Sequence, residues 1–271
     1  DGPADAIVEH PDVRRMLLTQ RVIAEGGRAM VVYASQFADL YGGGKNEQVR
    51  SDAEARLGFC TPNLKGFITE LGVEAANHGV QVFGGHGYIK EWGMEQILRD
   101  SRIATIYEGT TGIQALDLVG RKVLLDKFRQ LNLFTGDMLK FAGQFVPWKS
   151  QGKSKMLRRQ AWAVAKLALK WRYLGYRLAM RARKNADNVG AASVDFMMFS
   201  GYAYMAFMWL QMSAAAERQL QAGEGDKQFL EEKLQTAEFF FARILPRVNS
   251  HAKCMSARVD TLMGMPTSYF E

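Results

Sequence analysis

The residues best suited to chemistry lie between Gln81 and Gln114 of this 271-residue chain. A single carboxylate, Glu108, lies in the turn Tyr-Glu-Gly-Thr just before a helical pattern. Apolar neighbours that exclude water favour the protonated form of a carboxylate, whereas a nearby helix N-terminus favours the ionised form. A carboxylate under both influences can serve as a base that removes an acidic C–H proton. The alternative is an exposed glutamate that only stabilises the start of the helix.

A second break in the helical pattern, Gly84-Gly85-His86-Gly87, lies upstream of that turn. Glycine adopts dihedral angles that other residues avoid, and its bare backbone can offer N–H groups to a pyrophosphate. The dinucleotide fingerprint needs a strand before its glycines, and here a helical stripe precedes them, so a βαβ unit is excluded. On spacing alone, a plain turn between two helices explains these glycines equally well.

Helical periodicity accounts for the elements that position both breaks, and it predicts an all-α fold. After a linker over Asp1–Glu9, the pattern of the first half predicts a helix of about eight turns that begins at His10-Pro11 and ends at Gly42–Gly44. It then predicts a helix from Val49 to Val82 kinked by Pro62, a loop over 84–93, a short helix near Met94–Ser101, and a helix capped by Thr110 or Thr111.

The second half predicts an antiparallel bundle of four helices near 129–146, 154–188, 193–221 and 226–262. The loops expected between them are 149–153, 188–192 and 223–226. We therefore divide the chain into units of residues 1–127 and 128–271. The 21 residues from Phe196 to Ala216 carry no formal charge, a length that could span a bilayer. Their polar members favour the buried central helix of a soluble bundle.

The charge of the chain is +7 and its excess is local, since Lys149–Lys184 holds six lysines, six arginines and no acidic residue. This block predicts either contact with an anionic partner or a solvated helix face paired with acidic groups elsewhere. Large apolar residues alternate with the basic ones in this block: Trp162, Leu169, Trp171, Leu174 and Leu178. They indicate that much of the helix is buried, which favours a structural role. Peripheral docking on a membrane with anionic lipid is the competing hypothesis. No nucleic-acid-binding motif accompanies the block, so we expect no nucleic-acid partner.

Cysteine and histidine usage excludes two further classes of protein. Two cysteines form no disulfide framework, which fits a reducing, cytoplasmic location. The four histidines are scattered, so we predict no metal site.

The segment QVFGGHGYIKEWGMEQILRDSRIATIYEGTTGIQ resembles the C-terminal α-domain of the flavin-dependent acyl-CoA dehydrogenases. Its pieces keep the order and separation of the family pattern: Gln-Val-Phe-Gly-Gly from Gln81, then Arg99-Asp100, then Ile-Tyr-Glu-Gly-Thr from Ile106. The similarity covers roughly Glu9 to Val123. The remaining half resembles the extra helical domain of the long bacterial members and, less specifically, that of the very-long-chain enzymes.

The resemblance implies that Glu108 is the catalytic base, which removes the α-proton of an acyl-CoA thioester while the β-hydrogen leaves as hydride to FAD. It also implies that Tyr107 and Gly109 line the acyl-thioester pocket and that Thr110 meets the flavin nucleotide. A further set of residues is implied to contact the FAD pyrophosphate of a neighbouring subunit: Gln81, Val82, Phe83, Gly84 and Gly85. This contact implies a homodimer or a larger assembly. Electrons are implied to pass to an electron-transfer flavoprotein.

Two departures accompany the resemblance. Many members carry Gln two residues after the threonine, where this chain has Gly112, although Gln114 matches the pattern. The N-terminal helical domain, the β-domain and the first bundle helix of the family would all precede Asp1. We therefore expect a fragment that is inactive alone. The alternative function is a non-catalytic helical scaffold or a membrane-docking module.

Overall fold

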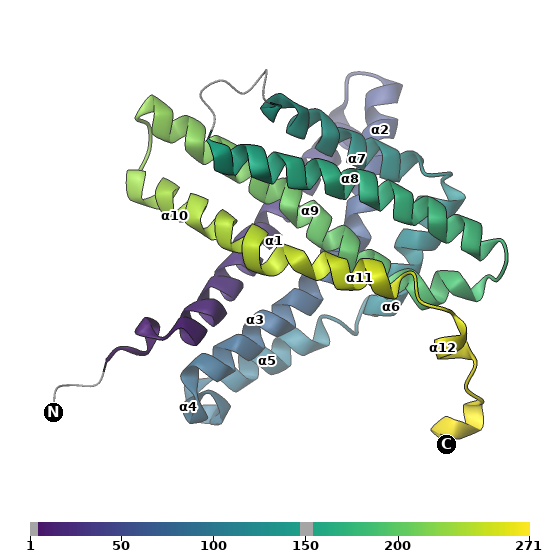
Figure 1. Cartoon of the computed structure of the whole chain (residues 1–271), viewed down its shortest axis with the longest axis horizontal. Coiled ribbons are helices and arrows are strands. Elements are labelled where there is room, and N and C mark those ends of the chain that lie inside the picture. The colour runs from purple at the N-terminus through teal and green to yellow at the C-terminus, as the bar shows by residue number, and fades with distance from the viewer. Residues whose placement is uncertain (1–4, 147–153) are drawn as a thin grey trace.

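The structure, a computed structural model, describes residues 5–146 and 154–271. All regular elements within these ranges are helices, which confirms the predicted all-α class. Figure 1 shows the long helices α8, α9 and α10 crossing one part of the molecule, while α3, α4 and α5 form a separate projection below them.

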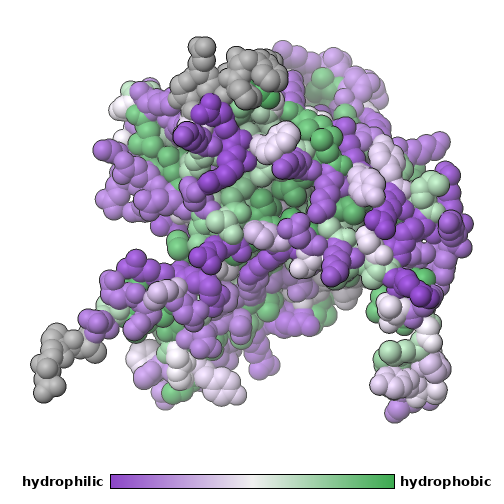
Figure 2. Space-filling view, in the orientation of Figure 1, coloured by the Kyte–Doolittle hydropathy of each residue, from purple (hydrophilic) through white to green (hydrophobic). Residues whose placement is uncertain are grey.

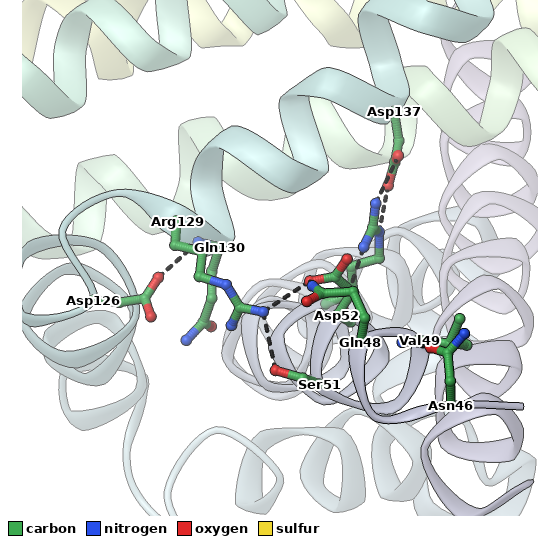
Figure 3. A network of polar contacts seen from close by, with 10 residues as sticks. Asn46, Gln48, Val49, Ser51, Asp52, Asp126, Arg129, Gln130 and Asp137 are labelled. Carbon is green, nitrogen blue, oxygen red and sulfur yellow. Dashed lines mark hydrogen bonds and ion pairs between the residues drawn. The ribbon is translucent and has the colours of Figure 1, made fainter. Parts of the chain in front are cut away.

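The first half contributes α1 (Pro11–Gly43), α2 (Glu47–Pro62), α3 (Ile68–Phe83), α4 (Gly85–Tyr88), α5 (Met94–Ile103) and α6 (Thr111–Leu116). A 3-10 turn, Ile7–Glu9, precedes α1 within the predicted linker. Pro11 lies in the first turn of α1, where a missing N–H costs no helical hydrogen bond. Asn46 caps α2 by accepting a hydrogen bond from the N–H of Val49 at 2.9 Å (Figure 3).

The helix predicted over 49–82 is two helices joined by a π-helical turn, η2 (Asn63–Phe67). Pro62 ends α2, and the wider turn directly after it accommodates the loss of its N–H. The predicted loop over 84–93 is wrong in part, because it contains α4 and a 3-10 turn, Lys90–Trp92. Gly87 permits this compact path, since a Cβ there would lie 2.3 Å from the carbonyl oxygen of Val80.

The second half contributes α7 (Arg129–Ala142), α8 (Lys155–Ala182), α9 (Asp187–Ala222), α10 (Lys227–Phe239), α11 (Val248–Cys254) and α12 (Asp260–Met263). The loop predicted at 188–192 is wrong: α9 already begins at Asp187, whose N–H donates to Asn185 Oδ1 at 2.8 Å. The loop at 223–226 is observed, with Gly223 ending α9 at φ +69°. The predicted loop at 149–153 lies outside the described residues.

The helix predicted over 226–262 is interrupted in its middle. A π-helical turn, Phe240–Ile244, is followed by a 3-10 turn, Leu245–Arg247, before α11 begins. Pro246 explains the break, because it can neither donate a backbone hydrogen bond nor fit within a regular helix interior. Figure 1 shows the resulting arm, α10 followed by α11, lying alongside α9.

Helix α9 is the centre of the core, and it packs against α1, α6, α8, α10 and α11. The uncharged segment Phe196–Ala216 is largely buried within the core of the chain, as predicted for a central helix. Within residues 5–146 and 154–271, no helix combines the length and apolarity needed to cross a bilayer. The core is continuous across the predicted boundary at residue 127, and that division into two units stays a prediction.

Aromatic rings from both halves meet in this core. Phe134 of α7 lies 5.4 Å from Phe59 of α2 and 4.8 Å from Tyr204 of α9, measured between ring centroids. The buried Tyr204 hydroxyl donates to the carbonyl oxygen of Met30 at 2.7 Å. Tilted and edge-to-face ring contacts of this kind add to the free energy of burial, so the two halves stabilise one another.

Polar contacts also join the halves at the surface, as Figure 3 shows for α2 and α7. Arg56 forms a bidentate ion pair with Asp137, with N–O distances of 2.6 and 3.0 Å. Arg129 donates to Asp52 at 2.8 Å and to Ser51 at 3.1 Å. These pairs fix the angle at which α7 leaves the first half of the chain.

Helix α8 is less buried than its sequence predicted. Trp171, Leu174 and Leu178 are buried, as expected. Trp162 and Leu169 were also expected to be buried and are instead exposed. They lie on one exposed stripe of α8 that borders α7, where Trp162 lines a groove of about 440 Å³ with Leu139 and Ala142, so the helix carries apolar residues on two faces.

Helix α9 packs tightly against the π-helical turn η2 at two glycines. A Cβ at Gly201 would lie 2.0 Å from Cγ of Phe67, and one at Gly66 would lie 2.4 Å from Sδ of Met197. Phe67 also meets the ring of Tyr202 edge-on, at a centroid distance of 4.8 Å. No side chain other than hydrogen fits at position 201 unless η2 moves.

We predict that Gly201→Ala destabilises the protein by about 1–3 kcal/mol, because the added methyl overpacks Phe67. The matched control is Gly190→Ala on the same helix, where a Cβ would meet nothing within 4 Å. This control should be stabilised by up to about 1 kcal/mol through helix propensity. Chemical unfolding of the two variants measures the difference, and equal stabilities would contradict the close contact.

Candidate functional site

The turn that carries Glu108 has an unusual backbone. Glu108 has φ +53° and Gly109 has φ +91°, so two successive residues are left-handed. For a residue other than glycine this conformation costs about 1–2 kcal/mol. Such strain persists only where the surroundings fix it, and it is concentrated at functional sites. The side chain of Glu108 is exposed.

Hydrogen bonds to both carbonyl groups hold this turn. Gln114 Nε2 donates to the carbonyl oxygen of Glu108 at 3.2 Å, and Lys65 Nζ donates to that of Gly109. The ammonium group of Lys65 also lies 5.9 Å from the ring centroid of Tyr107. The turn is thus bonded through its backbone, which leaves the carboxylate of Glu108 without a hydrogen-bond partner within residues 5–146 and 154–271.

The start of α6 supplies two further anchors. Thr110 is the N-cap, and its hydroxyl accepts a hydrogen bond from the N–H of Ile113 at 3.4 Å. Thr111, the alternative cap, instead donates its hydroxyl to Glu70 Oε1 of α3 at 2.5 Å, while its N–H donates to Thr105 O at 3.2 Å. The open choice between the two threonines is therefore decided in favour of Thr110.

Apolar side chains surround the turn without covering it. Tyr107 is 51% exposed, and its exposed apolar neighbours are Ile103, Ile106, Ile113 and Leu116. The expectation that apolar neighbours withdraw Glu108 from water is not met by the described residues, since these side chains themselves face solvent. An exposed apolar rim of this kind marks a surface that binds a ligand or another protein.

The other predicted site segment, Gln81–Gly85, lies at the opposite end of α5. It forms the C-terminal end of α3 and the start of α4, whereas the Glu108 turn follows α5. The ten residues of α5 span about 15 Å, so the structure does not bring the two segments together. Figure 1 shows α4 and α6 well apart.

The residues of this segment differ in exposure. Gln81, Phe83, Gly84 and Gly85 are exposed, and Val82 is half-buried. Gly84 has φ +61° and ψ −141°, and a Cβ there would meet no atom within 4 Å. Its bare backbone is thus open to a group outside this chain, as a pyrophosphate contact requires.

A groove of about 740 Å³ lies beside α5 and is lined by nine residues, among them Val80, Tyr88, Arg99 and Ile103. Tyr107 and Glu108 are not among its lining residues. The groove therefore separates the two predicted segments, and the described residues do not form an enclosed pocket around Glu108.

Two residues of the site were missed by sequence reasoning. Lys65 and Glu70 contact the turn from η2 and α3, more than 35 positions upstream. Neither follows from helical periodicity, because each resembles a solvated polar residue of an amphipathic helix. The one available signal was Pro62, which predicts an irregular turn where Lys65 lies.

Two solved structures share this fold. An acyl-CoA dehydrogenase from Bacillus anthracis complexed with FAD matches with a TM-score of 0.70 at 18% identity, over 99% of this chain and 45% of that one. Caenorhabditis elegans ACDH-11 in complex with C11-CoA matches with a TM-score of 0.66 at 19% identity, over 88% of this chain and 37% of that one. The fold is that of the helical part of these dehydrogenases.

Sequence comparison extends the likeness from fold to family. The family described as acyl-CoA dehydrogenase, C-terminal domain, matches residues 3–124, and that described as acetyl-CoA dehydrogenase C-terminal like matches residues 134–266. The chain belongs to the acyl-CoA dehydrogenase family, which confirms the resemblance recognised in its sequence.

Several curated relatives match along nearly the whole chain. The 3-methylmercaptopropionyl-CoA dehydrogenase of Ruegeria pomeroyi is 40% identical over 268 residues, which are 97% of this chain and 44% of the relative. The broad-specificity linear acyl-CoA dehydrogenase FadE5 of Mycobacterium tuberculosis is 29% identical over 281 residues, 99% of this chain and 44% of the relative. The chain thus spans less than half the length of these relatives.

The left-handed turn makes a prediction about stability. Glu108→Val should be less stable than Glu108→Gly by about 1–2 kcal/mol, because a β-branched residue fits a positive φ worst and glycine fits it best. Urea unfolding of both variants measures this difference. If valine is tolerated as well as glycine, the backbone at position 108 is not left-handed in solution.

Proposed function

We propose that this chain is the helical C-terminal part of an FAD-dependent acyl-CoA dehydrogenase that oxidises the Cα–Cβ bond of an acyl-CoA thioester. The observation that carries the proposal is the turn at Glu108, which is left-handed, anchored through its backbone and exposed at the side chain. Family membership supports it, as do the relatives named for acyl-CoA oxidation.

Glu108 removes the α-proton of the substrate in this mechanism. The thioester carbonyl makes that proton acidic, so a correctly placed carboxylate suffices as the base. The β-hydrogen leaves with its electron pair, and a carbon–carbon double bond forms between Cα and Cβ. FAD, when bound, supplies the hydride acceptor. An electron-transfer flavoprotein then takes up the two electrons.

The neighbours of Glu108 orient the substrate. Tyr107 presents an exposed ring and Gly109 a bare backbone, and both line the acyl-thioester pocket. A Cβ at Gly109 would lie 2.9 Å from Gln114 Nε2, so a larger residue would displace the amide that holds Glu108. Thr110, the N-cap of α6, meets the flavin nucleotide.

The segment Gln81–Gly85 binds the FAD pyrophosphate of a neighbouring subunit. The open backbone at Gly84 fits such a contact, and the separation from Glu108 by the length of α5 supports a second subunit as its source. The exposed apolar side chains around the segment, such as Tyr88 and Trp92, supply an interface. The functional protein is therefore at least a homodimer.

Replacement of the base should stop the reaction. In the protein expressed from its complete gene, we expect Glu108→Gln to abolish flavin bleaching by acyl-CoA while bound FAD is retained, since glutamine cannot accept the α-proton. Anaerobic absorbance spectra before and after acyl-CoA addition measure this. Unchanged bleaching would remove Glu108 from the mechanism and favour the alternative of a non-catalytic scaffold.

A second role, peripheral contact between the cytoplasmic enzyme and the inner face of a membrane, is supported by the exposed side of α8. Its basic residues, and the pairing of Lys166 with the Trp162 ring at 5.0 Å, suit a surface that carries anionic lipid. The apolar residues exposed on this side are Trp162, Leu169, Tyr173, Tyr176 and Met180. Figure 2 shows hydrophobic residues gathered beside α8 among hydrophilic ones.

Vesicle flotation tests this role. The protein should float with vesicles of phosphatidylcholine and phosphatidylglycerol at low salt and release at high salt, since exposed charges are screened. Lys166→Glu should weaken flotation several-fold, whereas the same charge change at Lys45, in the turn between α1 and α2, should not. Absence of salt-sensitive flotation excludes the membrane role and leaves α8 a structural one.

A further inference from the structure

Lys65 interacts with the residues on both sides of Glu108. Its ammonium group donates to the carbonyl oxygen of Gly109 and lies 5.9 Å from the ring of Tyr107, within the range of a cation–π contact. The residue before the carboxylate and the residue after it thus share one cationic partner. Gln114 also donates a hydrogen bond to the turn, at the carbonyl oxygen of Glu108. However, Gln114 belongs to α6, the helix that directly follows the turn in the chain.

Lys65 is the anchor that comes from elsewhere in the fold. A left-handed glutamate holds its conformation only if groups outside the turn over-determine it. The only lysine or arginine that bonds the backbone of residues 107–110, within the described ranges, is Lys65. A charged donor makes a stronger hydrogen bond than a neutral amide.

The position of Lys65 is itself fixed by the π-helical turn η2. Thr69 donates its hydroxyl to the carbonyl oxygen of Lys65 at 2.6 Å, and the side chain of Asn63 donates to Phe59 O at 3.1 Å. Both bonds lie within one turn of Lys65, so the backbone that carries the ammonium group has little freedom. Because the π-helical turn is wider than an α-helical turn, Lys65 faces a different direction from the one that continuous α-helical spacing between α2 and α3 would give it.

Helix α9 closes the other side of the same turn. Gly66, next to Lys65, would place a Cβ 2.4 Å from Met197 Sδ of α9 and 3.4 Å from Cβ of Gln114. Phe67 lies against the bare backbone of Gly201. The two anchors of the Glu108 turn, Lys65 and Gln114, are therefore packed through Gly66 against one helix of the second half.

We infer that Lys65 is a positioning residue for the reaction, which sets the Glu108 turn by holding the Gly109 carbonyl group, and that α9 fixes Lys65 in place. This inference rests on the proposed function of Glu108 as the base. Loss of the ammonium group frees the Gly109 peptide, so the carboxylate leaves the geometry needed for proton abstraction. The expected loss is therefore in the rate of proton abstraction, beyond any change in the affinity for acyl-CoA.

The test compares Lys65→Met with Lys65→Arg in the protein expressed from its complete gene. Stopped-flow flavin reduction by an acyl-CoA should slow on the order of 100-fold in Lys65→Met, because misplacement of a catalytic group has effects of that size. The rate is compared at saturating acyl-CoA, and flavin content and melting temperature should match those of the wild type. Lys65→Arg, which keeps a charged donor, should recover at least about a tenth of the rate. Lys140→Met on α7 is the matched control and should reduce flavin at the wild-type rate.

Each result decides the inference. A wild-type reduction rate in Lys65→Met overturns it, as does a loss of rate that only follows loss of flavin or of folded protein. If Lys65→Met does not fold, Lys65→Gln replaces it, and a rate equal to that of Lys65→Arg overturns the inference. Glu108→Gln is measured in parallel: reduction by that variant refutes the proposed function itself, whereas its inactivity beside a wild-type rate in Lys65→Met refutes only the role of Lys65.

Discussion

The ring of Phe67 occupies the space that any side chain at position 201 would need. This contact packs the π-helical turn η2 against α9. The positions of Lys65 and of the Glu108 turn relative to α9 depend on it. Well-packed interiors transmit displacement because they hold few voids. A shift of α9 therefore moves η2, and with it Lys65 and the turn that Lys65 bonds. The second half of the chain thus contributes to the geometry of the turn that carries the proposed base, Glu108.

The same dependence explains why the two halves share one core. Tyr204 of α9 bonds the backbone of α1, and Arg247 pairs with Glu74 of α3 through two bonds of 2.7 and 2.8 Å. Hydrogen bonds to the carboxylate of Glu74 raise the pKa of Arg247, so this guanidinium group stays charged. Glu108, by contrast, is exposed. The packed core thus supports a turn whose glutamate side chain is open to solvent.

Sequence reasoning recovered the fold class because long amphipathic stripes leave little choice of element. It placed the breaks less well, since Pro62 and Pro246 each produce a π-helical or 3-10 turn whose shape depends on tertiary packing. The exposed Trp162 shows a further limit: a large apolar residue on a helix does not reveal whether a partner covers it within the chain.

For the site, the sequence indicated the residues but not their support. The local pattern proposed Glu108 and Thr110, and of these two predictions the structure confirms only that Thr110 caps α6. The left-handed backbone of Glu108 could not be predicted, because nothing marks a glutamate as having a positive φ. Lys65 could not be found either, since its contact with Gly109 joins residues 44 positions apart. The separation of Gln81–Gly85 from Glu108 by the length of α5 could not be predicted either, because no local pattern encodes it.

The central claim is that Glu108 takes a proton from the carbon next to a thioester carbonyl. The most direct measurement follows deuterium entering that carbon when the enzyme is incubated with an acyl-CoA in D2O, with NMR as the readout. The account predicts exchange at the α-carbon with the wild-type enzyme and none above background with Glu108→Gln. Exchange at the same rate in both proteins would show that another group is the base.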